Sequence, residues 1–357
     1  MNILFVNRSD AYEVLGGDTI QMVETKNALE KLGLKVDVSL GKKDVSFYKD
    51  YDIIHCFNVQ TDKFVFKEVE KIKKAKKCLV ISPIWWDFEQ DMSDEYSSYN
   101  WKVKLVYNIF GEKTVKFIKR KKLEKRYDRI KKILNIANFI LPNSKMEIAS
   151  LKRCFSFDEN KIYVVYNGVD NSFIDQSIEK TEKERQYALQ VGRIEYTKNT
   201  LLTIKACKEL GIPLKIIGKK IDEVYYNRCI LESKGANVIF MKPKEHLELI
   251  KIYKNAKLHV LPSFRETPGL VSLEAGVLGC NIVTTEIGST REYFGKYGYY
   301  CDPKDYNSIK NSIEKAWIET SNYKLRNHII SNFTWDIAAV QTLEVYNITL
   351  DNISEDI

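Results

Sequence analysis

Short apolar runs recur along the whole chain, and segments with the apolar spacing of helices separate them. The runs expected to form strands are Ile3–Val6, Val36–Val38, Ile53–Cys56, Leu79–Ile81, Phe139–Leu141, Ile162–Val165, Ala188–Val191, Leu214–Ile217, Val238–Phe240, Leu258–Leu261 and Ile282–Thr284. Helical patterns fill the intervals, as at Leu201–Leu210 and Glu245–Ala256. Strands that alternate with helices form parallel sheets covered by helices on both faces. The pattern therefore predicts an α/β fold.

The length of 357 residues is too great for one typical hydrophobic core and suits two domains. The apolar runs begin a second series after the turn-forming sequence Asn167-Gly168-Val169-Asp170. We therefore expect one domain over residues 1–168 and a second from residue 169, with a charged linker at Gln176–Gln186. Open parallel sheets bind ligands at the carboxyl ends of their strands, so we expect a site there, between the domains.

Composition excludes several classes of protein. The hydrophobic content of 44% and the charged content of 29% are ordinary for a soluble globular protein. No run approaches the roughly 18 apolar residues of a membrane-spanning helix, and the apolar stretch Met1–Val6 is too short for a signal peptide. The seven cysteines form no Cys-x-x-Cys pair and the four histidines are scattered, which indicates free thiols in a reducing cytoplasm and no metal site. The Asp50-Tyr51-Asp52 sequence resembles a metal motif but precedes a strand, where ligands rarely bind, so we interpret it as a turn.

The sequence that follows Leu258 combines the parts of an anion-binding site. The run Leu258–Leu261 predicts a buried strand, Pro268-Gly269 predicts a turn, and the apolar residues after it predict a helix through Leu278. The first amides of a helix lack intrahelical acceptors and lie at the positive end of its dipole, so this turn can hold a phosphate. Glu266 and Glu274 lie on either side and offer carboxylates to hydroxyl groups. Together these groups suit a nucleotide sugar.

This stretch resembles the donor-binding signature of the retaining, two-domain glycosyltransferases of family 4, the group 1 glycosyltransferases, which have the GT-B fold. The family has two glutamates separated by seven residues, with Pro-Ser upstream and Ala-x-x-x-Gly downstream. Glu266 and Glu274 have this spacing, and Pro262-Ser263 and Ala275–Gly279 supply the flanks. Pro268 departs from the family, which usually has an aromatic residue before the glycine.

The resemblance covers nearly the whole chain and implies two Rossmann-like α/β/α domains whose parallel sheets face each other across a cleft. Residues 1–168 would bind the acceptor, and residues 169–334 would bind the nucleotide-sugar donor. The sequence Phe333–Ala339 is similar to the start of the family's closing helix, so residues 335–357 are expected to return to the first domain.

The resemblance also implies roles for the signature residues. Glu266 would contact hydroxyls of the donor sugar and Glu274 the ribose, while the amides of Gly269, Leu270 and Val271 would face the sugar or phosphate. Retention would come from front-face attack, with a leaving phosphate oxygen taking the proton of the acceptor. A glycosidase also uses two carboxylates, but it needs them on opposite sides of the bond, whereas one strand-turn-helix segment supplies both of these.

The sequence from Val191 to Asn199 resembles a strand-end loop of the family in which two cations hold the donor diphosphate. Arg193 and Lys198 occupy those positions. The leaving nucleotide gains charge as the glycosidic bond breaks, so fixed cations stabilise the transition state and can replace magnesium. We therefore expect no metal and no cofactor. The alternative is that both side chains are merely solvated.

Two further segments lie at the ends of predicted strands. Gly16-Gly17 lets the backbone approach a phosphate or sugar closely, although a plain turn before a helix has the same sequence. After the fourth strand the family often has a histidine that touches the donor sugar, and this chain has Trp85, Trp86 and Asp87 instead. These residues are candidates for contact with the acceptor or the donor sugar, and burial of both tryptophans in the core is the alternative.

The basic residues concentrate between Lys102 and Lys132, which contain thirteen Lys or Arg and three Asp or Glu, so the net charge of +10 exceeds the +8 of the whole chain. From Leu123 to Ala137 the apolar spacing predicts an amphipathic helix whose lysines can be its wet face. The earlier part mixes aromatic residues with lysines and can lie on an anionic membrane surface. The candidate membrane contacts are Lys113, Lys116, Lys119, Arg120, Lys121 and Lys122. Single-stranded nucleic acid is a weaker alternative partner.

These features predict a cytoplasmic, metal-independent hexosyltransferase, peripheral on the inner face of the cell membrane. It would move a sugar from a nucleoside-diphosphate sugar, UDP rather than GDP, to a glycan or lipid-linked oligosaccharide of a cell-surface polysaccharide. Three alternatives stay open. They are a catalytically inactive GT-B binding protein, a GT-B sugar-nucleotide epimerase that needs no acceptor, and a nucleic-acid binder with salt-dependent affinity.

Overall fold

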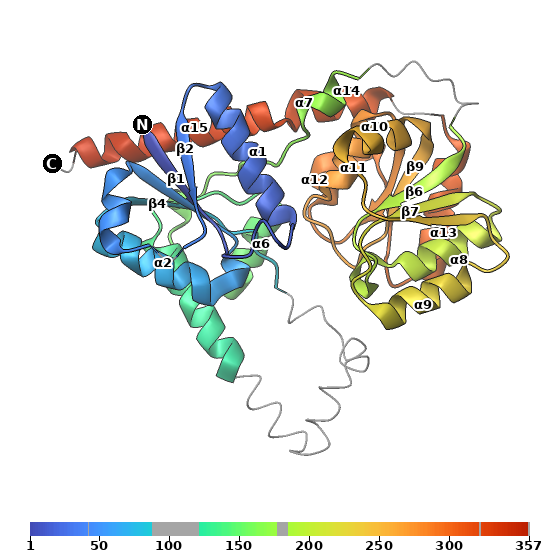
Figure 1. Cartoon of the computed structure of the whole chain (residues 1–357), viewed down its shortest axis with the longest axis horizontal. Coiled ribbons are helices and arrows are strands. Elements are labelled where there is room, and N and C mark those ends of the chain that lie inside the picture. The colour runs from blue at the N-terminus through green and yellow to red at the C-terminus, as the bar shows by residue number, and fades with distance from the viewer. Residues whose placement is uncertain (42, 88–120, 177–184, 321–322, 356–357) are drawn as a thin grey trace. The chain divides into compact units, whose positions relative to one another are not determined.

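The computed structural model describes residues 1–41, 43–87, 121–176, 185–320 and 323–355, and it divides into two compact units (Figure 1). Unit 1 comprises Met1–Val165 and Ala339–Ile357, and unit 2 comprises Tyr166–Ala338. Unit 1 is therefore discontinuous in sequence, because the chain leaves it after Val165 and re-enters it at Ala339. The predicted linker falls largely on residues 177–184, outside the described residues.

Unit 1 is built on a five-stranded sheet in which every neighbouring pair of strands is parallel, in the order β2-β1-β3-β4-β5. The strands are β1 (Asn2–Val6), β2 (Lys35–Ser39), β3 (Ile53–Phe57), β4 (Cys78–Ser82) and β5 (Phe139–Ile140). Its described α-helices include α1 (Gly17–Lys31), α2 (Asp62–Lys74), α6 (Lys145–Cys154) and α15 (Trp335–Glu355), and a further helix covers residues 121–136. Short 3-10 helices lie at η1 (Val45–Asp50), η2 (Val59–Thr61) and η3 (Glu159–Lys161).

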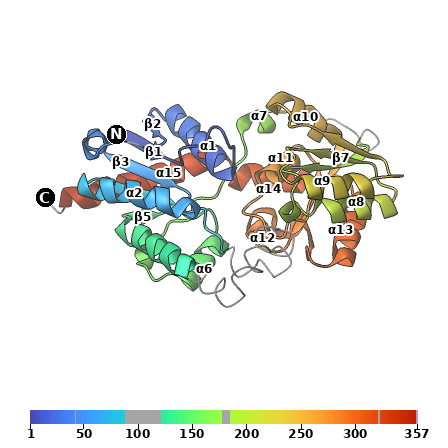
Figure 2. The same cartoon turned by 60° about the horizontal axis from the view of Figure 1, so that its bottom comes forward.

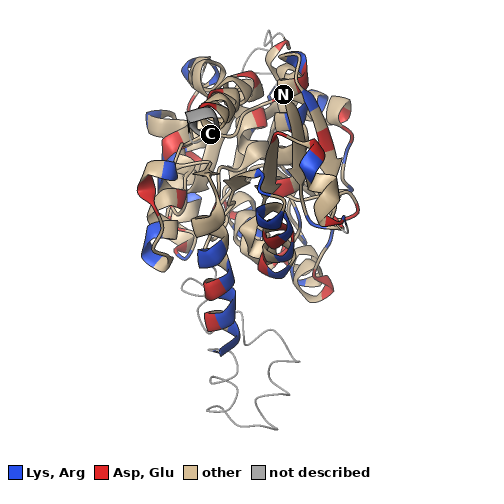
Figure 3. Ribbon diagram, turned by 90° about the vertical axis from the view of Figure 1, so that its left-hand side faces the viewer, with Lys and Arg blue, Asp and Glu red and all other residues tan. Residues whose placement is uncertain are grey.

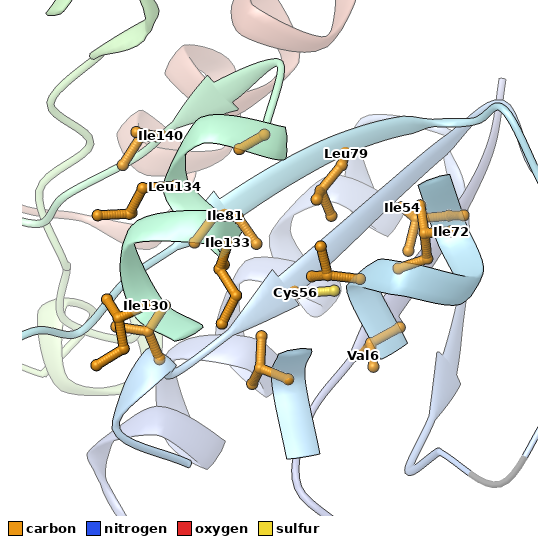
Figure 4. Packing of buried hydrophobic residues seen from close by; sticks show 14 of the residues in the cluster. Val6, Ile54, Cys56, Ile72, Leu79, Ile81, Ile130, Ile133, Leu134 and Ile140 are labelled. Atoms are coloured by element: carbon orange, nitrogen blue, oxygen red, sulfur yellow. The ribbon is translucent and has the colours of Figure 1, made fainter. Parts of the chain in front are cut away.

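One face of this sheet packs against α2 and the helix of residues 121–136. Alternate strand residues such as Ile54, Cys56 and Ile81 point to this face, as the period of two along a strand requires. Figure 4 shows Ile72 of α2 and Ile130 of the second helix over the same strands. The amphipathic helix predicted between Leu123 and Ala137 is thereby confirmed.

The opposite face of the same sheet carries a buried polar contact with α15. His55, in the middle of β3, is 1% exposed and stacks on Phe57. Its Nδ1 lies 2.6 Å from the hydroxyl of Tyr346 on α15, and its Nε2 lies 2.8 Å from Oγ of Ser82. Burial lowers the pKa of His55 to about 3, so the ring is neutral near pH 7. The returning helix is therefore part of the core of unit 1.

Unit 2 contains a six-stranded sheet, again with parallel neighbours, in the order β11-β10-β9-β6-β7-β8. Its strands are β6 (Tyr187–Val191), β7 (Leu214–Ile217), β8 (Val238–Met241), β9 (Ala256–Leu261), β10 (Asn281–Thr285) and β11 (Tyr299–Cys301). Its helices are α7 (Asn171–Ile174), α8 (Thr200–Glu209), α9 (Glu223–Glu232), α10 (His246–Asn255), α11 (Leu270–Val277), α12 (Thr290–Phe294), α13 (Tyr306–Ile318) and α14 (Tyr323–Asn332), with 3-10 helices η5 (Tyr196–Lys198) and η6 (Gly295–Tyr297).

Helices cover both faces of this second sheet (Figure 2). Helices α8, α9 and α13 contribute Ile204, Cys229 and Ile313 to a core with Leu258 of β9. Helices α10, α11 and α14 enclose the other face, in a cluster that contains Leu273 of α11. Both units are thus α/β/α sandwiches with parallel sheets, as the alternation of strands and helices predicts.

Two strand predictions need correction. Ile162–Val165 is not a strand, because only Ile162 forms a bridge, to Ile140 of the two-residue strand β5. Backbone bonds from Tyr163 and Val165 to the same edge show that the segment is extended but too loosely paired to continue the sheet. The edge strand β11 was not predicted from the sequence.

The strand orders define one special position in each sheet. In unit 2 the order reverses between β6 and β9, and in unit 1 it reverses between β1 and β3. Loops that leave the carboxyl ends of two such strands run in opposite directions, so they open a crevice in which parallel α/β sheets bind ligands. The loops after β6 and β9 are therefore the first place to examine for a site in unit 2.

Candidate functional site

The loop after β6 is shaped by two glycines. Gly192 has φ of +150°, and its amide donates to the carbonyl of Ile217 on the neighbouring strand at 2.9 Å. A Cβ on Gly218, which follows β7, would lie 1.7 Å from the carbonyl oxygen of Gly192, so only glycine fits there. This close contact fixes the start of the loop that carries Arg193 and Lys198.

The two cations of this loop have different surroundings. The Lys198 ammonium lies 2.5 Å from Oε1 of Glu266, and the side chains are 22% and 8% exposed. The Arg193 guanidinium is 54% exposed and lies 3.0 Å from Oε1 of Glu195. The structure therefore brings two of the three residues predicted to be catalytic into contact, and it places Arg193 at the surface of the same loop.

Both the side chain and the backbone of Glu266 form hydrogen bonds that fix its position. Ser263 Oγ donates to the same Oε1 at 2.6 Å. The Glu266 amide donates to the carbonyl of Ile287, and its carbonyl accepts from the amide of Ser289 at 3.0 Å. A Cβ on Gly288 would lie 2.1 Å from that carbonyl oxygen, so the loop after β10 also depends on glycine. The carboxylate is thus fixed where the loops after β6, β9 and β10 converge.

The loops after β6 and β9 also contact each other directly. The amide of Phe264 donates to the carbonyl of Thr197 at 3.0 Å. The ring of Phe264 stacks on that of Tyr196, with centroids 4.9 Å apart and planes 22° apart. The contact between Lys198 and Glu266 is therefore part of one packed assembly of two loops.

The turn before α11 has the conformation that the sequence predicts. Gly269 caps the helix with φ of +77°, a left-handed conformation that favours glycine. The amides of Leu270 and Val271 lie in the first turn of α11, ahead of the bond from the Ser272 amide to the Gly269 carbonyl. A Cβ on Gly269 would lie 3.5 Å from Oε2 of Glu266. The carboxylate, the cation and the helix amides therefore belong to one small region.

Glu274 lies farther along α11 and is half-buried. Tyr253 of α10 donates its hydroxyl to Oε2 of Glu274 at 3.1 Å. Burial, together with this carboxylate, raises the pKa of Tyr253 well above its ordinary value, so the hydroxyl keeps its proton and stays a donor. This contact fixes the orientation of the Glu274 carboxylate.

Gly16 and Gly17 lie at the corresponding crevice of unit 1, at the start of α1. Gly16 caps that helix, and a Cβ there would lie 2.6 Å from Oδ1 of Asp18, whereas a Cβ on Gly17 would contact nothing within 4 Å. Burial raises the pKa of Asp18, but hydrogen bonds from Arg8 and Asn58 outweigh this and lower it. The charges at this crevice are therefore satisfied within the protein.

The residues after β4 are buried. Trp85 is 1% exposed and packs edge-to-face on Phe155, with ring centroids 5.0 Å apart. Trp86 is 6% exposed and Asp87 is 3% exposed, and Asp87 accepts a hydrogen bond from Tyr127 at 2.7 Å. An indole that is 1% exposed offers no face to a sugar, so the structure favours the core interpretation of Trp85.

The predicted membrane contacts fall mostly outside the described residues. Lys113, Lys116, Lys119 and Arg120 belong to the segment 88–120, while Lys121 and Lys122 are exposed at the start of the helix of residues 121–136. Figure 3 shows Lys and Arg along this helix, with Asp and Glu between them. Among the helices of the described ranges, none is long and apolar enough to cross a membrane. The same ranges contain no group of three or more His, Cys, Asp or Glu arranged to hold a metal ion.

Several supporting side chains were not predicted from the sequence. Ser263, Tyr253, Gln190 and His259 all contact site residues or their loops. Ser263 belongs to the Pro-Ser pair of the family signature, so its position could have been inferred. The others act across separations of eight to 68 residues, which no local pattern reveals.

The geometry defines a class: a two-unit parallel α/β protein in which two loops and a helix terminus bring a cation, a carboxylate and helix amides together at the switch point of unit 2. Residues 172–334 match the family described as "Glycosyl transferases group 1". An uncharacterized glycosyltransferase of Methanocaldococcus jannaschii is 26% identical over 233 residues, which is 58% of each chain. The family match therefore lies within unit 2, and the chain spans little more than half the length of that relative.

Solved structures show the fold class. Sucrose-phosphate synthase from Thermosynechococcus elongatus matches with a TM-score of 0.76 at 16% identity, covering 99% of this chain and 100% of that one. HepE of Anabaena, solved in complex with UDP and glucose, matches with a TM-score of 0.70 at 16% identity, covering 97% and 99%. The fold is GT-B, as the sequence predicts.

Proposed function

We propose that the chain is a hexosyltransferase that moves a sugar from a nucleoside-diphosphate sugar to a glycan or lipid-linked acceptor. The observation that carries the proposal is the contact of Lys198 with Glu266 beside the first amides of α11. The match of residues 172–334 to the group 1 glycosyl transferases supports sugar transfer, and the UDP complex of HepE supports a UDP-sugar as the favoured donor. A GDP-sugar is the second choice.

The donor diphosphate would lie against the α11 amides, with Arg193 and Lys198 as counter-charges. An ion pair that already holds Lys198 near Glu266 would rearrange when the diphosphate takes the ammonium. The free carboxylate of Glu266 would then accept hydrogen bonds from sugar hydroxyls. The charge that develops on the leaving phosphate is stabilised by groups already fixed by Gly218, Ser263 and Gly288, so little reorganisation is needed in the transition state.

We further propose retention of the anomeric configuration and activity without a metal. A front-face attack needs no protein nucleophile, because the leaving phosphate oxygen takes the proton of the acceptor. Two cations and the helix amides supply the positive charge for which other enzymes use magnesium. Activity that survives EDTA and a product with the donor's anomeric configuration, read by NMR, are the expected results. An inverted product would overturn retention alone.

A nucleotide panel tests the donor site. Thermal unfolding is followed with UDP, GDP, ADP and CMP and their common sugar conjugates, for the wild type, Glu274→Ala and the control Glu248→Ala. Glu248 is exposed on α10 and pairs with Lys244, which lies two residues before that helix. A ligand at about 100 times its Kd adds roughly 2.7 kcal/mol, which is several degrees. A shift with one base that is reduced only in Glu274→Ala supports the proposal, and no shift with any nucleotide overturns it.

The same panel separates the alternatives. An inactive binding protein would shift with a nucleotide sugar but release no nucleotide with any acceptor. An epimerase would convert the donor sugar without an acceptor. A nucleic-acid binder would show oligonucleotide affinity that falls steeply with salt.

We also propose that the protein is peripheral on the inner face of the cell membrane, in contact with anionic lipid. Lys121 and Lys122 are exposed, and each basic residue near such a surface contributes about 1 kcal/mol. Cosedimentation with vesicles of anionic lipid is expected to weaken severalfold in the double variant Lys121→Glu with Lys122→Glu. Equal binding to neutral vesicles would contradict this.

A further inference from the structure

A fully buried histidine lies behind the donor site and contacts two of its three parts. His259, near the end of β9, is 0% exposed and pairs with Leu189 of β6 in the strand ladder. Its Nε2 lies 3.4 Å from the amide nitrogen of Val191, which directly precedes the Gly192–Lys198 loop. Its Nδ1 lies 3.2 Å from Oγ of Ser272, the third residue of α11. One ring therefore joins the loop with the cations to the helix with the phosphate amides.

The two contacts determine which ring nitrogen carries the proton. A backbone amide can only donate, so Nε2 must accept from Val191 and carry no hydrogen. A neutral imidazole then has its proton on Nδ1, which donates to Ser272 Oγ. Burial lowers the pKa of His259 to about 3, so the ring stays neutral at physiological pH. A protonated ring would lose the bond to Val191.

The amide of Val191 needs this partner because the strand ladder ends before it. Pairing of β6 with β9 is recorded at Tyr187, Ala188 and Leu189, and not at Val191. Val191 is 7% exposed, so its amide is shielded from water. The His259 side chain, which extends from β9, thus continues the ladder by one bond. That bond lies at the start of the Gly192–Lys198 loop, here called the cation loop.

We propose that His259 is a positioning residue for donor binding, which holds the Val191 amide and the Ser272 hydroxyl so that the cation loop and the α11 amides meet the same diphosphate. The inference rests on the proposed function of this site. It gives this chain a second function for β9, since the strand that delivers Glu266 to the site would also align the two neighbouring loops. His259 itself would touch no substrate atom.

Three variants and one matched control test the role. His259→Phe keeps a ring of similar size but removes both polar atoms, while His259→Gln restores one acceptor and one donor. Ser272→Ala removes only the hydroxyl and is the variant least able to disturb folding. His55→Phe is the control, because His55 is also buried and neutral but lies in unit 1. There it is hydrogen-bonded to Tyr346 and not to the donor site.

The measurement is the Kd for UDP and for the donor sugar by calorimetry, followed by KM and kcat. We expect roughly tenfold weaker binding in His259→Phe, severalfold weaker binding in Ser272→Ala, and at least partial recovery in His259→Gln. His55→Phe is expected to lower the unfolding temperature without changing the Kd. Nitrogen NMR of the wild-type imidazole should show Nε2 without a proton and Nδ1 with one.

The outcomes separate this inference from the proposed function. If the wild type binds a nucleotide and His259→Phe and Ser272→Ala bind it equally well, the positioning role is wrong while the donor site stands. Equal weakening in His55→Phe, or the opposite tautomer in the NMR spectrum, also overturns it. If the wild type binds no nucleotide at all, the proposed function fails, and the positioning role fails with it.

Discussion

The crevices of the two sheets have the same topology and different chemistry. In unit 2, Lys198 and Glu266 reach the crevice from separate strand ends. They lie beside the N-terminus of α11, whose first amides have no acceptor within the helix. In unit 1, Arg8 pairs with Asp10 and Asp18, and Asn58 donates to Asp18. The loop between them exposes Tyr12, Val14 and Leu15. A parallel sheet thus supplies the location of a site, and the side chains at its strand ends decide whether that site attracts an anion.

The largest expected effect follows from Glu266→Ala, which should reduce kcat of sugar transfer roughly 100- to 1000-fold. It removes the carboxylate proposed to hold the sugar and leaves Lys198 without its partner. Glu286→Ala is the matched control, because that exposed carboxylate on the adjoining loop pairs with Arg291. Steady-state kinetics check the prediction, and full activity in Glu266→Ala would show that unit 2's crevice is not the reaction site.

Lys198→Met and Arg8→Met form the next pair. Lys198→Met should weaken nucleotide binding by about ten- to 100-fold, since a charge-assisted bond to the diphosphate is worth about 1.5–3 kcal/mol. Arg8→Met should leave nucleotide binding unchanged but lower the free energy of unfolding, because it removes the ion pair of the buried Asp18 carboxylate with Arg8. Lys208→Met, an exposed change on α8, controls for loss of charge. Calorimetry and urea unfolding distinguish the two, and weaker nucleotide binding in Arg8→Met would contradict the comparison.

The glycine pair of unit 1 offers a smaller and sharper test. Gly16→Ala should lower the free energy of unfolding by about 1–2 kcal/mol, because the added methyl group would displace Asp18 from Arg8 and Asn58. Gly17→Ala meets no atom within 4 Å and should raise stability by about 0.5 kcal/mol. Urea unfolding measures both, and equal effects would show that the contact with Asp18 is unimportant. Neither change should alter nucleotide affinity.

The last prediction concerns the dependence of stability on pH. His55 and His259 titrate near 6.5 when unfolded but only at about 3 in the folded protein. Between these values unfolding takes up protons, so the free energy of unfolding should fall as the pH is lowered from 6.5 towards 3, by about 1.4 kcal/mol per unit for each histidine. His55→Phe and His259→Phe should each flatten this slope in urea unfolding at several pH values. An unchanged slope would mean that the rings are not neutral.

The sequence predicted most strands because each apolar run is long enough to lie across a sheet. It could not predict strand order, which depends on contacts between distant runs, and so it could not place β6 beside β9. The edge strand β11 escaped prediction because Tyr299 and Tyr300 are only half-buried and give no clear apolar run. Ile162–Val165 shows the reverse, an apolar run that is extended but pairs at one residue.

The sequence identified candidate residues of the site, but it did not predict which of them contact one another. The signature spacing placed Glu266 near the helix terminus, but its contact with Lys198 spans 68 residues of sequence. Trp85, an aromatic residue at a strand end, reads equally well as a sugar platform or as core until Phe155 is seen against it. Long-range packing settles such cases, and one sequence alone does not record it.

The contact of Tyr346 with His55 has a consequence for how the protein is made. The ribosome synthesises a chain from its N-terminus to its C-terminus, and N-terminal domains usually fold first. Here the sheet of unit 1 emerges first, but the helix that covers His55 is translated after all of unit 2. The second unit can therefore complete its fold on the ribosome while His55 in the sheet of the first unit still lacks its contact with α15.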